Sequence, residues 1–111
     1  MTEFYDFLKH KHAYVALGEF TPGKFQEAQQ LFEKAVSTYE QGFKGAYLLQ
    51  EPSTDKGIAI IFWENLEDMD ANNNEICDAI LQKMSHLFSK PPTTSFYEVS
   101  SEIETKDVVK V

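Results

Sequence analysis

The sequence is poor in cysteine, in basic residues and in long apolar runs. Its single cysteine, Cys77, excludes an internal disulfide, and no Cys/His pairs stand at zinc-site spacing. Only 10 Lys and Arg residues accompany 18 Asp and Glu, for a formal net charge of −8 at pH 7. That charge repels phosphate backbones and excludes nucleic acid as a partner. No run approaches the roughly 20 apolar residues of a membrane span, and no signal peptide is recognisable, so we expect no membrane association and a cytoplasmic location.

What the chain does have is size and aromatic side chains. Its 111 residues suit one domain with a core of its own, and 14% of them are aromatic. We expect this domain over residues 12–103, after an N-terminal arm, 1–11, and before a C-terminal tail, 104–111. The arm is either a short helical segment docked by its aromatics or a frayed end. The valines of the tail could pair with the edge of a sheet.

The first half of the domain has the pattern of a strand followed by a helix. His12 to Phe20 is rich in β-favouring residues, and both of its faces are apolar, which predicts a central strand. Apolar residues then recur at intervals of three and four from Phe25 to Tyr39, as in an amphipathic helix. Thr21 is the expected N-cap, with a proline at the first helical position, and Gly42 is the expected C-cap.

The second half predicts a hairpin, a broken helix and a last strand. Two β-rich runs, 43–51 and 57–64, are separated by a short polar turn. Asn65 and Asp68 are placed to form a capping box at the start of a helix. Residues 70–74 favour a break before the helix resumes over 75–88. Its apolar face is expected to carry Ile76, Ala79, Ile80, Met84, Leu87 and Phe88. The last strand is expected over 93–103.

This order of elements, βαββαβ, predicts an α+β, ferredoxin-like fold with a four-stranded antiparallel sheet. Right-handed crossovers place both helices on one face of that sheet. Because every strand also offers apolar side chains to the opposite face, that face would be left bare. We therefore expect a homodimer in which the bare faces of two sheets meet.

Three short segments carry a resemblance to a known group. They are Thr21-Pro22-Gly23-Lys24, Gly42-Phe43-Lys44-Gly45-Ala46 and Phe62-Trp63-Glu64-Asn65-Leu66-Glu67. Together with the order of elements, they resemble the dimeric α/β barrel superfamily, and within it the antibiotic-biosynthesis-monooxygenase-like domains. The resemblance covers residues 12–103. It implies a dimer with a pocket between sheet and helices in each subunit, which among relatives serves cofactor-independent oxygenation of polyphenols or haem degradation.

Trp63 is the main candidate for contact with a ligand, because the resemblance places it in the substrate pocket and its indole offers a flat face and one N–H donor. The alternative is a core tryptophan that seals the sheet against the second helix. The same two readings, an apolar cavity with a few polar groups or a closely packed interior, apply to the other candidates. These are Tyr14, Phe25, Phe32, Tyr47, Asn72, Asn73 and Tyr97.

No cofactor or metal is expected. The haem-degrading relatives need an Asn on the first strand and a His on the second helix, and the resemblance aligns these positions with Ala16 and Asn73, which cannot bind haem in that way. His10 and His12 form a pair without a third ligand. Cys77 has no neighbouring base and reads as a buried, inert thiol.

Two functions remain open from the sequence. The first is a dimeric small-molecule-binding or cofactor-independent monooxygenase-like protein for an apolar or aromatic ligand, with Trp63 and a tyrosine or asparagine positioning an activatable phenol. The second is a non-catalytic structural or regulatory homodimer without a ligand pocket. A cavity with convergent polar groups favours the first, and a dry, packed interior favours the second.

Overall fold

The computed structural model describes residues 11–103, so the predicted tail and all of the predicted arm except Lys11 lie outside it. Four strands and three helices follow each other along the chain. They are β1 (His12–Glu19), α2 (Phe25–Val36), β2 (Phe43–Gln50), β3 (Lys56–Trp63), α3 (Leu66–Ala71), α4 (Glu75–Ser85) and β4 (Thr93–Glu98). No helix in the described range is long and apolar enough to cross a membrane.

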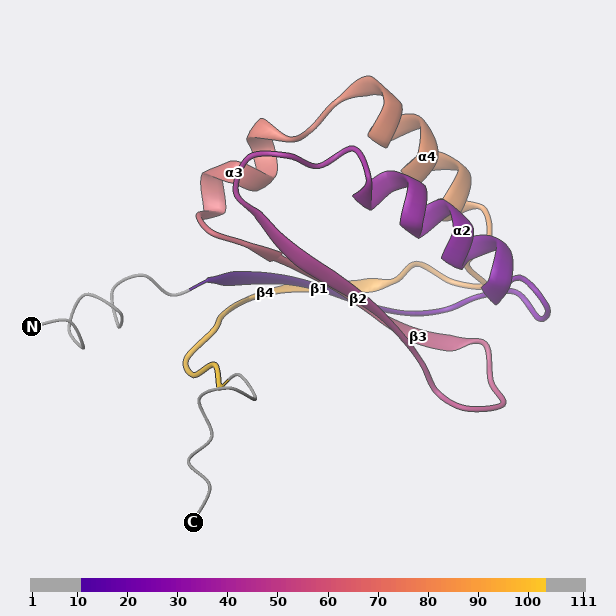
Figure 1. The fold of residues 1–111 in the computed structure, drawn as a ribbon. Coiled ribbons are helices and arrows are strands. Elements are labelled where there is room, and N and C mark those ends of the chain that lie inside the picture. The colour runs from indigo at the N-terminus through magenta and orange to yellow at the C-terminus, as the bar shows by residue number, and fades with distance from the viewer. Residues whose placement is uncertain (1–10, 104–111) are drawn as a thin grey trace, which may run out of the picture.

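The strands form one antiparallel sheet in the order β2-β3-β1-β4. All helices lie on the same side of it, with α2 and α4 over its face and α3 at one end (Figure 1). β1 is central, between β3 and β4, as its apolar faces predicted. The predicted ferredoxin-like α+β fold is thus confirmed.

The N-terminus of α2 differs from the prediction. The helix begins at Phe25 with Lys24 in the N-cap position, and no side chain caps it. Thr21 instead belongs to a turn in which its carbonyl accepts a hydrogen bond from Lys24 N at 2.9 Å. A glycine with φ of 83° at position 23 lets the chain reverse there, so the Thr-Pro-Gly segment forms a turn before the helix and not its first residues.

The C-terminus of α2 also lies earlier than expected, at Val36. The hydroxyls of Ser37 and Thr38 donate to the carbonyls of Lys34 and Ala35 and so satisfy two acceptors of the last turn. Gly42 does have a left-handed backbone, with φ of 80°, but it lies in the loop that enters β2. The predicted glycine cap is therefore wrong, because side-chain hydroxyls end the helix first.

The broken second helix is confirmed. The predicted capping box of Asn65 and Asp68 is present, with the backbone N–H of Asn65 donating to Asp68 Oδ2 at 3.1 Å, and α3 ends after Ala71. Asn74 then starts α4, because its side chain accepts the N–H of Cys77 at 2.8 Å. Two asparagine N-caps within ten residues, Asn65 and Asn74, explain why one helix becomes two.

The last strand is shorter than predicted and ends at Glu98. Its partner β1 begins at His12, which stands directly opposite Glu98, so the ladder has no further strand to pair with. One additional backbone bond, from Val99 N to Lys11 O at 2.8 Å, closes this end of the sheet.

The face of the sheet that carries no helix bears large apolar side chains. Strand register places Leu17 opposite Ile58, and Val15 opposite Ile60, on this face. Tyr47 of β2 lies beside Ile60, and its ring meets Phe62 edge to face at 6.2 Å. Leu17 remains 45% exposed. The sequence-based expectation of a bare apolar face is thus confirmed for the described chain.

Candidate functional site

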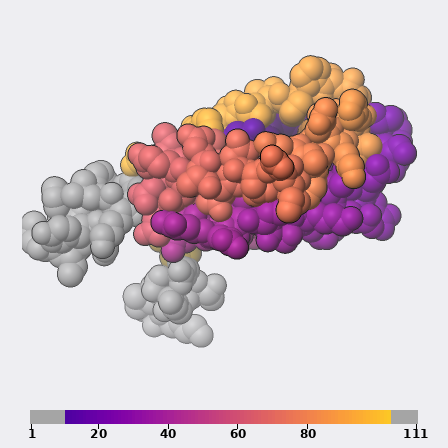
Figure 2. Space-filling model, turned by 90° about the horizontal axis from the view of Figure 1, so that it is seen from above, coloured from indigo at the N-terminus to yellow at the C-terminus, as the bar shows by residue number. Residues whose placement is uncertain are grey.

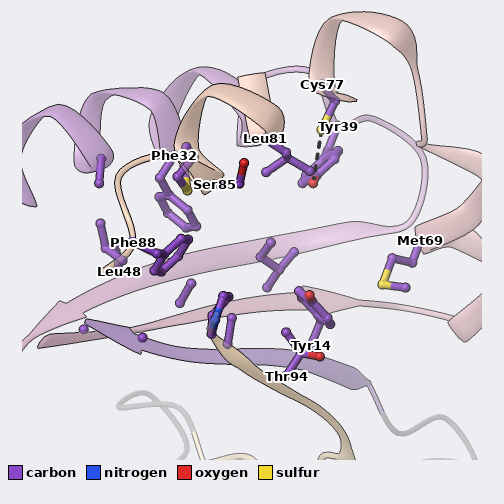
Figure 3. A pocket seen from close by; sticks show the side chains of 18 of the residues that line it. Tyr14, Phe32, Tyr39, Leu48, Met69, Cys77, Leu81, Ser85, Phe88 and Thr94 are labelled. Carbon is purple, nitrogen blue, oxygen red and sulfur yellow. Dashed lines mark hydrogen bonds between the residues drawn. The ribbon is translucent and has the colours of Figure 1, made fainter. Parts of the chain in front are cut away.

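Small residues line the middle of the helix-covered face. In the two central strands, Ala16 is paired with Ala59 and Gly18 with Gly57. Side chains this short do not reach the helices above them. A cavity of about 460 Å³ therefore lies between the sheet and helices α2 and α4 (Figure 3). A space of this size is within the range of small-molecule sites in proteins.

Aromatic rings close one end of the cavity. Phe20 stacks on Phe88 with ring centroids 4.4 Å apart and meets Phe25 edge to face at 5.5 Å. The rings of Phe88 and Phe25 lie directly over Gly18 and Gly57, where a Cβ atom would overlap them. The two glycines thus permit a close approach of rings to the sheet.

The opposite end is closed by Trp63, which is only 2% exposed. Its ring makes edge-to-face contacts with Tyr39 and Phe43, at centroid distances of 4.9 and 5.8 Å. The indole N–H is buried and has no hydrogen-bond partner among the described residues. Trp63 is therefore both a core residue and part of the cavity wall, the two positions that the sequence left open for it.

Helix α4 forms the roof with one stripe of side chains. Cys77, Leu81, Met84 and Ser85 line the cavity at helical spacing, and Phe88 follows just beyond the helix. Met84 and Phe88 belong to the predicted apolar face, but in the first turns of the helix Cys77 and Leu81 line the cavity in place of the predicted Ile76 and Ile80.

Ile76 is 68% exposed, whereas Cys77 is only 2% exposed, which corrects the predicted apolar face of α4. The reason is the Asn74 cap, whose bond to Cys77 N fixes how the helix starts. The predicted burial of Cys77 is confirmed.

Two hydroxyl groups face each other across the cavity. Tyr39, from the loop after α2, points toward the sheet, and Tyr14, from β1, points toward the helices (Figure 3). Cys77 Sγ donates to the Tyr39 hydroxyl oxygen at 3.5 Å. Burial raises the pKa of Tyr39 well above its ordinary value, so this phenol is neutral at physiological pH.

Asn72 touches the cavity, but its amide is engaged in the fold. Its Oδ1 accepts from Glu40 N at 2.7 Å, and its Nδ2 donates to the carbonyls of Gln41 and Asp68 at 2.8 and 2.7 Å. The side chain ties the loop before β2 to α3. This use leaves Asn72 little capacity to bind a ligand as well.

The mouth of the cavity lies between α4 and β4. Seen from above, indigo atoms of β1 remain visible between these two elements, so the helices leave part of the central strand uncovered (Figure 2). The exposed lining residues mark the opening, and most of them are polar: Asp70, Asn73, Leu81, Ser85 and Thr94. An apolar interior thus opens to solvent through a mostly polar rim.

Five of the eight predicted ligand contacts line this cavity: Trp63, Tyr14, Phe32, Asn72 and Asn73. Tyr47 and Tyr97 do not, because their pairing with Ile60 and Ala13 puts them on the bare face. Phe25 packs in the core beside Phe20. Which face of the sheet each of these tyrosines points to depends on strand register, and the local sequence does not determine that register. The predicted ligand contacts did not include Cys77, Leu81, Met84 and Phe88, although the helical spacing already placed Met84 and Phe88 on the apolar face of this helix.

The described residues offer neither a metal site nor an axial histidine for haem in the cavity. Over residues 11–103, no group of three or more His, Cys, Asp and Glu side chains could hold a metal ion. The positions that the resemblance aligns with the haem-binding residues hold a methyl group, Ala16, and an exposed amide, Asn73. His86 is the exposed C-cap of α4. These residues do not fit haem.

The fold is shared with solved structures of low sequence identity. A conserved protein from Methanosarcina mazei superposes with a TM-score of 0.73 at 18% identity, covering 84% of this chain and 96% of that one. SnoaB from Streptomyces nogalater, a cofactor-independent oxygenase, gives 0.74 at 14% identity, over 84% and 96%. A protein from Nitrosomonas europaea, described as a putative antibiotic biosynthesis monooxygenase, gives 0.73 at 11%, over 81% and 90%.

These likenesses confirm at the level of fold the resemblance to antibiotic-biosynthesis-monooxygenase-like domains. No family model and no curated protein sequence matches the chain.

Proposed function

We propose that this chain forms a cytoplasmic homodimer whose helix-covered cavity binds an apolar or aromatic small molecule and acts as a cofactor-independent, monooxygenase-like site. The observation that carries the proposal is the cavity of about 460 Å³. Its walls are mostly apolar side chains, and the hydroxyls of Tyr14 and Tyr39 point into it from opposite sides. Its presence argues against a structural dimer with a packed, dry interior. The fold shared with an oxygenase such as SnoaB supports the choice of chemistry only by analogy.

The dimer part of the proposal rests on the bare sheet face. Val15, Leu17, Leu49, Ile58 and Ile60 form a continuous apolar surface across three strands. Monomeric proteins rarely leave such a surface in water, and a second copy offers the same flat, apolar face. Two such sheets packed face to face give a β-sandwich interface.

The chemical part of the proposal requires a substrate that reduces dioxygen itself. An activatable phenol supplies electrons from its ring, so that one oxygen atom enters the substrate and the other leaves as water with two substrate hydrogens. The neutral hydroxyls of Tyr14 and Tyr39 can donate to the oxyanion that develops, and Trp63 and Phe32 hold the ring by contact. No metal or haem is needed for this balance.

Oxygen uptake tests the proposal with dihydroxyanthrone as a phenolic probe. We expect the purified protein to accelerate uptake above the rate without protein, and a chelator to leave the acceleration unchanged. Ala16→Leu, which places a larger side chain on the cavity floor, should abolish the acceleration. A wild-type rate equal to the protein-free rate would contradict the proposed oxygenation. Trp63, the only tryptophan, reports binding separately through its fluorescence.

A further inference from the structure

The polar groups of the cavity indicate what a ligand must present to it. Tyr14 and Tyr39 extend their hydroxyls toward each other from the sheet and from the helix layer (Figure 3). Beside Tyr14 and its strand partner Ile61, the next inward-facing pair on the floor is Ala16 and Ala59, whose short side chains leave room for the body of a ligand. A flat molecule on this floor would have both hydroxyls within reach of one edge.

The hydrogen bond from Cys77 orients the hydroxyl group of Tyr39. The thiol of Cys77 donates to the Tyr39 oxygen at 3.5 Å, so one lone pair of that oxygen is occupied. The hydroxyl hydrogen is then directed away from the thiol. Burial of Cys77 keeps water from replacing the thiol as donor. Tyr39 therefore offers the cavity a hydrogen-bond donor.

Charge in the cavity disfavours an anionic ligand. The described lining residues include no Lys, Arg or His, and their one charged member is Asp70 at the mouth. A carboxylate or phosphate would lose its hydration without gaining a countercharge, and it would meet Asp70 on entry. A neutral molecule with an oxygen acceptor pays no such cost.

We propose that the hydroxyls of Tyr14 and Tyr39 bind an uncharged oxygen acceptor, such as a ketone carbonyl, on a ligand whose apolar body lies over Ala16 and Ala59, and that Cys77 is a positioning residue for Tyr39. This inference rests on the proposed function, namely that the cavity binds a small molecule. It adds the chemical class of the ligand and assigns a role to the single thiol.

Three probes of similar shape test the inference in equilibrium dialysis. Fluorenone carries a neutral carbonyl, fluorene has no acceptor, and fluorenecarboxylate carries a negative charge. We expect fluorenone to bind about tenfold more tightly than fluorene, because two hydrogen bonds of ordinary net strength suffice for that ratio. Fluorenecarboxylate should bind more weakly than fluorene.

Variants separate the hydrogen bonds from the shape of the cavity. Tyr39→Phe should lower the affinity for fluorenone several-fold and leave the affinity for fluorene unchanged. Cys77→Ala should lower the fluorenone affinity about twofold to threefold, and Cys77→Ser, which keeps a donor, should restore it. Tyr47→Phe is the matched control, since it removes the same oxygen atom from the opposite face of the sheet.

The outcomes distinguish this inference from the proposed function. Equal affinities of the wild-type protein for fluorenone and fluorene would overturn the donor pair but leave a cavity that binds apolar molecules. Failure of both probes to bind would overturn the proposed function and this inference with it. Loss of fluorene binding in Cys77→Ala would give the thiol a purely structural role.

Discussion

The two faces of the sheet carry side chains of very different size. On the helix-covered face, the central strands contribute the pairs Ala16 with Ala59 and Gly18 with Gly57. On the bare face, the same two strands contribute Val15 with Ile60 and Leu17 with Ile58. At these positions the larger side chains lie on the side that has no helices, and the smaller ones lie where a core would be expected.

The difference teaches that each face lacks a different kind of partner. Full burial of a Val, Leu or Ile side chain stabilises the folded protein by about 1.5–3 kcal/mol. The apolar side chains of the bare face gain only part of this stabilisation unless another flat surface covers them. The inner face has the helices that the outer one lacks, but its short side chains leave a cavity beneath them. A second copy of the chain could cover the bare face, and a small molecule could fill the cavity on the helix-covered face.

The largest expected effect comes from a charge on the bare face. Leu17→Asp should convert the dimer to a monomer at micromolar concentration, because the interface would bury an unpaired carboxylate from each copy. A penalty of about 3 kcal/mol raises the dissociation constant more than about 100-fold. Analytical ultracentrifugation measures it. Since Leu17 is already 45% exposed, circular dichroism should show an intact fold.

Ile76→Asp is the matched control for this charge. Ile76 is an exposed apolar residue on α4, on the other side of the sheet from the proposed interface. The same substitution there should leave the dimer intact. If both variants dissociate, or if the wild-type protein is itself monomeric, the bare face is not the interface.

A pair of substitutions on β1 tests the inner face, with opposite signs. Ala16→Leu should raise the free energy of unfolding by about 2 kcal/mol, because its three added carbons enter the cavity at about 0.8 kcal/mol each. Gly18→Ala, two residues away, should lower it by about 1–3 kcal/mol, because the new Cβ would overlap the Phe88 ring. Urea unfolding measures both. Equal destabilisation by the two variants would mean that no usable space exists above Ala16.

The smallest expected effect concerns pH and tests the burial of a tyrosine hydroxyl on the inner face. The folded-state pKa of Tyr39 is raised above its unfolded value near 10, so its contribution to stability is complete below about pH 10 and is lost as pH rises further. The stability difference between wild type and Tyr39→Phe should therefore shift by about 1 kcal/mol between about pH 9 and about pH 11. Urea unfolding at the two pH values measures the shift. A constant difference would contradict the burial of this hydroxyl.

Local signals in the sequence were sufficient for most of the fold. The strand pattern of β1, the polar turn between β2 and β3, and the asparagines of the broken helix each act over a few residues. The end of α2 was missed because Ser37 and Thr38 cap its carbonyls, a choice that competes with the glycine cap at Gly42.

The site was only partly predictable, because it depends on which way each side chain faces. A shift of one residue in the assumed face of α4 exchanges Ile76 for Cys77 as the buried side chain, and both are apolar enough to fit the pattern. For Tyr47 and Tyr97 the deciding information is strand register, which pairs residues far apart in the sequence. That small residues of two strands would meet at Ala16 and Ala59 follows from register as well.

Native mass spectrometry of the purified protein with added fluorenone tests the central claim most directly, because it reads out the partners of both faces in one spectrum. We expect a dimer that carries up to one fluorenone per chain, and an Ala16→Leu dimer that carries none. A monomeric wild-type protein would contradict the assignment of the bare face. A wild-type dimer that binds no more fluorenone than Ala16→Leu would contradict the assignment of the cavity.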